Sequence, residues 1–269
     1  MTRYPAVAHQ FYPGDPATLK KNLDKLIPRI PASQKIKASA VVSPHAGYIY
    51  SGAVAGETYS RVSIPENVII LGPNHHGLGP PVALMSEGQW EMPLGRIPIN
   101  EKFAQNLLAK GSSIRADSPA HQHEHSLEVQ IPFLQYFQQN LSIIPLVISH
   151  ISFETCISVA NKLSAAINDF DGDVLIVAST DMTHYESRKS ASEKDRLAIE
   201  RVLDLDPQGL YETVRRLRIS MCGIIPTTIA LLTALELGAT KAELVRYMDS
   251  GETSGDTAQV VGYAGFVIC

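Results

Sequence analysis

Histidines follow several of the predicted strands of this chain. The sequence holds 9 histidines among 269 residues. In an open α/β sheet, ligands bind outside the carboxyl ends of the strands. Histidine is a common acid, base and metal ligand, so histidines far apart in sequence could share one site at that edge. Those that follow short apolar runs directly or within a few residues are His45, His75, His76 and His184.

His75 and His76 are neighbours, and adjacent side chains point apart. We therefore expect His75 to face the site and His76 to support or pack beside it. His45 lies between Pro44 and the small residues Ala46 and Gly47, which let a ligand or backbone come close. A single histidine is more often structural, but several histidines at several strand ends favour a shared site.

A further group alternates along the chain: His121, His123 and His125. The segment from Glu124 to Glu128 is typical of the opening turn of a helix, and it is not an HExxH zinc motif. His125 is either part of that polar turn or an acid/base of the site. We expect His121 and His123 on the surface.

Two further residues could take part in chemistry. Asp181 either orients His184 through a ring N–H or caps the next turn. Cys222 precedes a predicted helix, where a lowered pKa would make it a thiolate ligand or nucleophile. Its alternative role is that of a small buried apolar residue.

The elements that must position these residues alternate between strand and helix, which indicates an α/β fold. Continuous β-branched runs are typical of strands buried on both faces. A hairpin-like excursion is expected over 73–100, and Pro132 either kinks its helix or marks the first turn. The predicted strands are 41–43, 68–71, 143–148, 174–177 and 260–268; the predicted helices are 103–108, 127–137, 157–167, 194–203, 210–217 and 227–237, the last ended by Gly238.

Composition narrows the function classes. The net charge is −4, which argues against nucleic-acid binding, and no apolar stretch approaches a membrane span. Three widely spaced cysteines without a CxxC pair argue against a disulfide framework, and we expect a cytoplasmic protein. Nucleotide-binding and esterase motifs are absent. One domain over 1–269 is expected, because no linker or repeat divides the chain.

An ordered set of motifs resembles the Memo family. The matching segments are SPHAGYIYSG at 43–52, LGPNHHG at 71–77, EHSLE at 124–128, STDMTH at 179–184, CGIIP at 222–226, TSGD at 253–256 and VVGY at 260–263. The resemblance implies a three-layer α/β/α domain with a central, mostly parallel sheet, similar to LigB-type extradiol dioxygenases. It also implies radical-SAM and AMMECR-type proteins as partners.

The dioxygenase relatives hold non-haem iron with two histidines and a carboxylate. Carried over by motif, His45 and His75 match the histidine ligands, and His184 matches the acid/base with Asp181 beside it. Cys222 stands where the enzymes have glutamate. A thiolate favours copper, zinc or a differently tuned iron site, and it makes the site easier to oxidise.

Three functions follow as hypotheses. The first is a redox-active iron or copper site made by His45, His75 and Cys222, with His184, Asp181 and His125 handling protons. The second is a binding module that captures a peptide or small molecule in the same pocket without turnover. The third is an active extradiol-type dioxygenase on an aromatic or alkyl substrate.

Overall fold

Four parallel strands form the centre of the main sheet. A computed structural model describes residues 1–269. In spatial order the central strands are β2 (Ala40–Ser43), β9 (Val174–Ser179), β3 (Asn67–Pro73) and β8 (Ser142–Ile148). All three pairings among them are parallel. Their carboxyl ends therefore share one edge, as the histidine pattern requires.

Antiparallel strands extend this centre on both sides and make the whole sheet mixed. Beside β2 lies β12 (Val260–Ile268), which also pairs with β11 (Ala242–Asp249) and β10 (His184–Glu186). Beside β8 lies β4 (Val82–Leu84), which pairs in parallel with β7 (Arg115–Ala116). The mostly parallel arrangement expected from the sequence thus holds for the central strands only.

A second, smaller sheet joins the N-terminus to the excursion expected over 73–100. It contains β1 (Thr2–Arg3), β5 (Gln89–Met92) and β6 (Gly95–Pro98). β5 and β6 pair as an antiparallel hairpin, and β1 lies parallel to β5. The hairpin is therefore confirmed, although β4 from the same stretch belongs to the main sheet.

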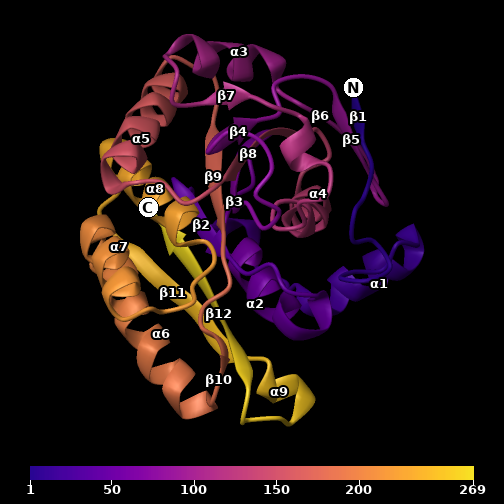
Figure 1. Ribbon diagram of the computed structural model, residues 1–269. Helices are drawn as coiled ribbons and strands as arrows, with labels where there is room; N and C mark the ends of the chain where they lie inside the picture. Colours follow the sequence, from indigo (N-terminus) through magenta and orange to yellow (C-terminus); the bar gives the residue numbers. More distant parts are fainter.

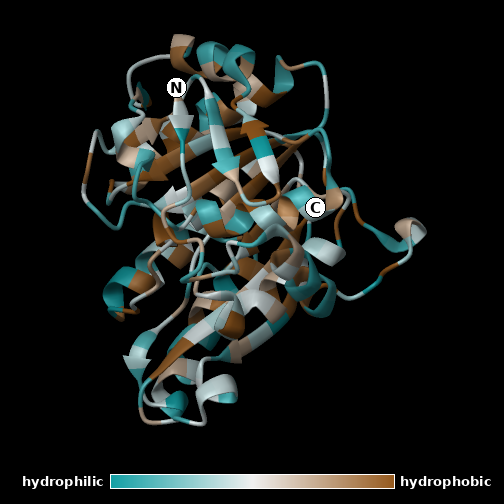
Figure 2. Cartoon of the chain, turned by 90° about the vertical axis from the view of Figure 1, so that its right-hand side faces the viewer, coloured by the Kyte–Doolittle hydropathy of each residue, from teal (hydrophilic) through white to brown (hydrophobic).

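Helices cover both faces of the main sheet and give the expected three layers (Figure 1). Ile69 and Leu71 of β3 point into one buried cluster, whereas Val68 and Ile70 point into the other. This alternation makes the central strands apolar throughout, and Figure 2 shows the hydrophobic strands enclosed by helices with more polar outer faces. The face to which Ile69 and Leu71 point is covered by α3 (Glu101–Ala109), α5 (Phe153–Asn168), α6 (Arg188–Leu203), α7 (Pro207–Arg216) and α8 (Ile224–Glu236). The opposite face is covered by α1 (Pro16–Leu26), α2 (Tyr48–Ser60) and α4 (Ile131–Phe137). The short helix α9 (Gly251–Ser254) follows β11.

Every predicted helix is present, but α1, α2 and the short α9 were not predicted. The reason is clearest for α2. Nine of its 13 residues are buried, so it has no polar face to give a helical period. At Gly56 an added Cβ would lie 2.2 Å from the Leu26 carbonyl oxygen, so a small residue lets the chain after α1 pack closely against α2. Pro132 lies in the first turn of α4 and does not kink the helix. Gly238 follows α8 with a φ of +89° and ends it as expected.

Candidate metal centre

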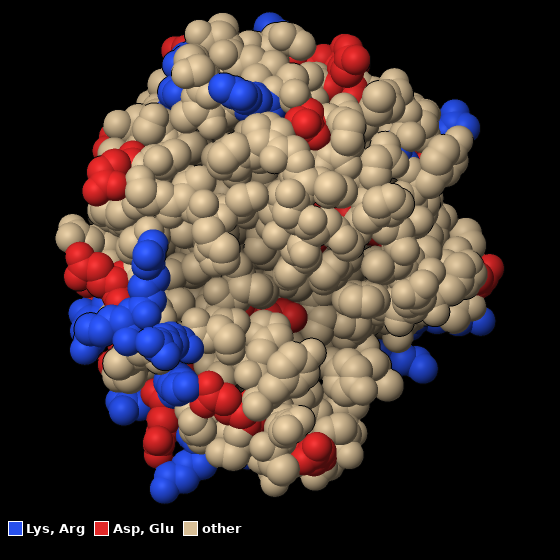
Figure 3. Space-filling model, in the orientation of Figure 1, with Lys and Arg blue, Asp and Glu red and all other residues tan.

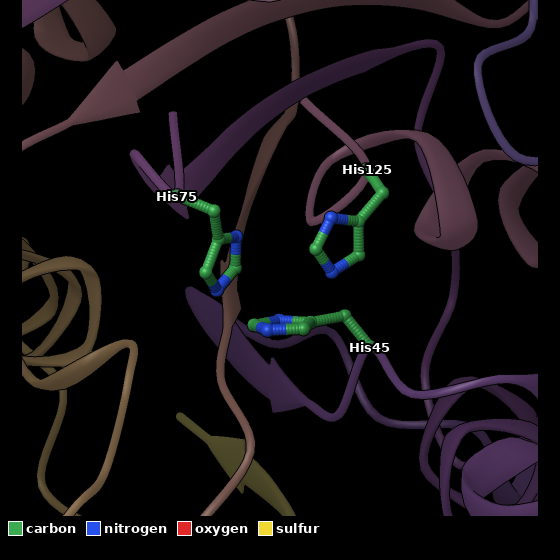
Figure 4. A group of neighbouring side chains, drawn as sticks. All are labelled: His45, His75 and His125. Carbon is green, nitrogen blue, oxygen red and sulfur yellow. The ribbon is translucent and has the colours of Figure 1, made fainter. Parts of the chain in front are cut away.

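Three imidazole rings meet at the carboxyl edge of the central strands. His45 follows β2 and His75 follows β3, while His125 comes from the loop before α4. One ligand nitrogen of each ring lies within 4.8 Å of one from each of the others. Ring centroids are 5.2 Å apart for His45 and His75, 5.5 Å for His45 and His125, and 4.6 Å for His75 and His125. Figure 4 shows the rings facing one shared space.

The buried ring of His45 is fixed by Ser179 at the end of β9. The Ser179 hydroxyl donates to the Ser126 carbonyl at 2.6 Å, so its oxygen can only accept from other groups. His45 Nδ1 lies 2.9 Å from that oxygen and must therefore carry the proton. The Gln130 amide donates to the same oxygen at 2.8 Å. This network leaves the lone pair on His45 Nε2.

Glu124 fixes His75 in the same way. Its Oε2 accepts the His75 backbone N–H at 2.7 Å, and its Oε1 lies 2.9 Å from His75 Nδ1. Burial alone would raise the pKa of Glu124. The hydrogen bonds from His75 and from the Ser126 amide, together with the charge of His75, outweigh burial and lower this pKa to about 2. The carboxylate stays ionised, orients the ring and leaves His75 Nε2 free.

Burial favours the neutral form of two of the three rings, His45 and His125. Burial is the largest cause that lowers the pKa of His45 well below its usual value, and the charges of His125 and His75 add to it. Burial likewise lowers the pKa of His125 to about 4, although Glu124 opposes the shift. Neutral imidazole is the form that binds metal, so His45 and His125 offer nitrogen lone pairs at neutral pH.

Cys222 reaches the same place from the N-terminus of α8. Its Sγ lies 3.2 Å from His45 Nε2 and accepts the Asp181 backbone N–H at 3.2 Å. The next residue, Gly223, would place a Cβ 2.2 Å from the Ser179 carbonyl oxygen, so only glycine allows this approach. Burial, and then the charge of Asp181, raises the pKa of the Cys222 thiol. Cys222 thus borders the three imidazoles but lies outside the group of donors that are all within 4.8 Å of one another.

Asp181 and His184 lie beside the cluster and do not bond to each other. Asp181 follows β9, and its Oδ1 accepts the His45 backbone N–H at 2.7 Å. Burial raises the pKa of Asp181 to about 6, against the amide of His45 and the charge of His184. The His184 Nδ1 lies 2.9 Å from the Ser220 carbonyl and donates to it. The interpretation that Asp181 orients the His184 ring is therefore wrong.

The remaining histidines divide differently from the prediction. His123 is exposed as expected, but His121 is completely buried, with its two ring nitrogens 2.9 Å and 3.1 Å from the carbonyls of Asp117 and Pro145. The placement of His121 on the surface is wrong, because a polar ring can be buried when carbonyl groups face it. His76 is exposed and contacts the His123 carbonyl.

The sequence analysis missed Glu124 and Ser179 as residues that orient ligands. Glu124 is buried, and its carboxylate lies against His75 and not at a helix terminus. The segment 124–128 is also not yet α-helix: a 3₁₀ turn covers Glu128–Gln130, and α4 begins at Ile131. An acidic residue beside a histidine was the signal for this role.

Comparison with known proteins agrees with the motifs. The model of the family described as Memo-like protein matches residues 3–267. The chain belongs to the Memo-like protein family. A MEMO1 family protein of Methanopyrus kandleri is 42% identical, with 99% of each chain covered. Another, from Aquifex aeolicus, is also 42% identical, with 98% of each chain covered.

A solved structure shows the same fold at low identity. An uncharacterized protein of Escherichia coli K12 is 13% identical with a TM-score of 0.52, and the match covers 85% of this chain and 99% of that one. None of the helices of this Memo-like protein has the length and apolar composition needed to cross a membrane.

Proposed function

We propose that this Memo-like protein binds a transition-metal ion at the cluster of His45, His75 and His125. The convergence of three imidazoles, with ligand nitrogens within 4.8 Å of one another, is the observation that carries the proposal. The donors fit such an ion, because the second ring nitrogen of His45 and of His75 is already hydrogen-bonded to protein. Their Nε2 atoms are then the ones available as ligands.

His125 and Cys222 are the candidates for the remaining ligand position. His125 belongs to the group of donors that are all within 4.8 Å of one another, whereas the Cys222 sulfur lies 3.2 Å from His45 Nε2. The resemblance to the dioxygenases favours Cys222, with His125 as an acid or base. The two roles differ in their consequence: removal of a ligand releases the ion, and removal of an acid or base does not.

We propose iron or copper as the ion. Imidazole suits both, and a thiolate ligand favours Cu(I) in particular. When bound, either ion supplies one-electron chemistry and polarises a coordinated group. The chain itself supplies the proton carriers. Asp181 has a pKa near 6 and His184 presents Nε2 once Nδ1 is bonded to Ser220, so both are proposed to hold or move protons beside the site.

Two other readings of the same site make different predictions. A binding module would capture a peptide or small molecule without turnover, and its affinity would not depend on metal. An extradiol-type dioxygenase would consume O2 with a catechol or related substrate. The association with radical-SAM and AMMECR-type proteins and the cytoplasmic location stay proposals that rest on the family resemblance.

The first test is metal content. Protein without an affinity tag, purified anaerobically, should hold iron or copper close to one ion per chain by elemental analysis. His45→Ala should lose it, and His123→Ala, with an exposed histidine near the site, should retain it. No metal in the parent protein after anaerobic reconstitution would overturn the proposal and favour the binding module. O2 uptake with a panel of catechols then separates the dioxygenase from other redox chemistry.

A further inference from the structure

A cavity of about 550 Å³ adjoins the candidate metal centre. His75 and Cys222 line one part of it. The ends of β3 and β8 with the residues that follow them, α7, the loop after α7 and the start of α8 line the rest. A cavity of this size is in the range of small-molecule sites. We propose that it binds a small organic anion, with an apolar body and one carboxylate or phosphate group, and that this anion is the substrate of the metal centre. The substrate role rests on the proposed function, whereas the binding does not.

The walls of the cavity suit an apolar body. Six aliphatic or thioether side chains come from the end of β8, from α7, from the loop that follows it and from the first turn of α8. Burial of a hydrocarbon ligand against such a surface contributes about 25 cal/mol per Å² of apolar area. The six residues are Ile148, Val214, Ile219, Met221, Ile224 and Ile225.

The charged residues of the cavity favour an anionic group at the other end of the ligand. Its 15 lining residues include Arg215 and Arg218 and no aspartate or glutamate, although the chain as a whole has a net charge of −4. Figure 3 shows Lys and Arg side chains gathered over α6 and α7 on this face. The guanidinium of Arg215 is bonded to the Tyr211 hydroxyl and lies 5.1 Å from its ring, whereas Arg218 forms no ion pair. Arg218 is therefore free to bind an anion, for which a guanidinium offers paired N–H donors.

The backbone of Arg218 adds an independent argument. It lies just after α7 with a φ of +51°, and the Ile219 N–H closes the helix by donating to the Val214 carbonyl at 2.9 Å. This is the left-handed position after a helix that glycine usually occupies. An arginine there is strained, and it contributes no ion pair to the fold. The side chain of Arg218 therefore stays available to a ligand.

The experiment compares the parent protein with Arg218→Gly by isothermal titration of 3-phenylpropionate, phenyl phosphate, inorganic phosphate and uncharged 3-phenylpropanol. We expect at least one of the two aryl anions to bind more tightly than both the alcohol and inorganic phosphate. Preference between the two aryl anions identifies carboxylate or phosphate as the anionic group. Arg218→Gly should weaken the favoured anion at least tenfold, which is the loss of one charge-assisted contact. The melting temperature should stay equal or rise by about 1–4 °C, because glycine relieves the strain.

Arg216→Gln is the matched control. Arg216 is the last residue of α7, two positions before Arg218; it is exposed and does not line the cavity. It should leave anion affinity within about twofold. Each of four outcomes would overturn the proposal. Two concern the variants: Arg218→Gly binds the anion as tightly as the parent does, or Arg216→Gln loses as much affinity as Arg218→Gly. The other two concern the probes: the alcohol binds as tightly as the aryl anions, or no probe binds more tightly than about 1 mM.

The titrations are run on metal-free and metal-loaded protein so that the two proposals can fail separately. Arg218→Gly should retain the metal content of the parent, because Arg218 is not one of the clustered donors. A parent that binds the aryl anion but no metal would refute the metal site and leave the anion site standing. A parent that holds metal but binds neither aryl anion would refute the anion site and leave the metal site standing.

Discussion

The Sγ of Cys222 lies 3.2 Å from the Nε2 of His45, across 177 positions of sequence. Hydrogen bonding leaves the lone pair on this Nε2, and the thiol is protonated at neutral pH because burial raises its pKa. The thiol can then donate to the imidazole when no metal is bound. A metal ion that takes both atoms as ligands would displace the thiol proton, so binding would release a proton.

Cys222→Ser tests this relationship. Serine keeps the size and the hydrogen-bonding capacity, so the fold should be unchanged by circular dichroism and melting temperature. The loss of a soft thiolate ligand should weaken copper or iron binding by at least tenfold. Competition titration with a chelator measures the affinity. An unchanged affinity would remove Cys222 from the ligand set and leave His125 as the third ligand.

Glu124→Gln should reduce metal affinity without touching a ligand. The neutral amide can no longer hold the His75 ring as a charged acceptor, and loss of such a supporting carboxylate costs about 10–100-fold in metal affinity. The same chelator competition applies. The control is Glu87→Gln, at an exposed glutamate outside the histidine cluster, and its metal affinity should equal that of the parent. An affinity equal to that of the parent would mean that His75 needs no orienting carboxylate.

The buried pair of Arg3 and Glu128 should dominate the stability of the N-terminal segment. Both side chains are fully buried, and Glu128 also accepts from the Tyr12 hydroxyl at 2.6 Å. Glu128→Gln leaves Arg3 without its charge partner and should lower the free energy of unfolding by about 3–5 kcal/mol. Chemical denaturation measures this change.

The exposed pair of Arg96 and Glu91 supplies the comparison. Their side chains are 69% and 35% exposed, so Glu91→Gln should cost less than about 1 kcal/mol. Similar losses in Glu128→Gln and Glu91→Gln would show that burial of the Arg3 pair adds nothing to its effect.

His121 should make the protein less stable in acid. Burial lowers its pKa to about 4, against an ordinary value near 6.5, although the carbonyls of Pro145 and Asp117 oppose the shift. Between these values the unfolded chain binds the proton and the folded chain does not, so stability falls as the pH drops from about 6.5 to 4. The contribution reaches about 3 kcal/mol at 1.36 kcal/mol per pH unit.

The measurement is the free energy of unfolding across that pH range, in the parent and in His121→Gln. The variant should be less stable at pH 7, where the ring is well packed, and its stability should depend less on pH. An unchanged pH slope in the variant would assign the acid sensitivity to other histidines, of which His45 and His125 also have lowered pKa values.

The sequence by itself determined the four central strands, β12, most of the long helices and the residues that follow the central strands. The apolar runs that form strands such as β3 and β9 are visible in the local sequence. Neighbouring parallel strands must bring their carboxyl ends to one edge of the sheet. His45, His75 and Asp181 could therefore be placed together from the chain alone. The motifs also identified the family, because an ordered set of short segments is specific even where each is weak.

Only the tertiary structure decided which groups orient and border the site. Glu124 and His121 looked like residues of a polar turn, since burial in a loop depends on what packs over it and has no period in sequence. The pairing of Asp181 with His184 failed for the same reason: proximity in sequence does not fix which acceptor a ring N–H meets, and the Ser220 carbonyl, 36 positions away, was the nearer partner. Helix α2 escaped prediction because a helix buried on nearly all sides carries no amphipathic pattern.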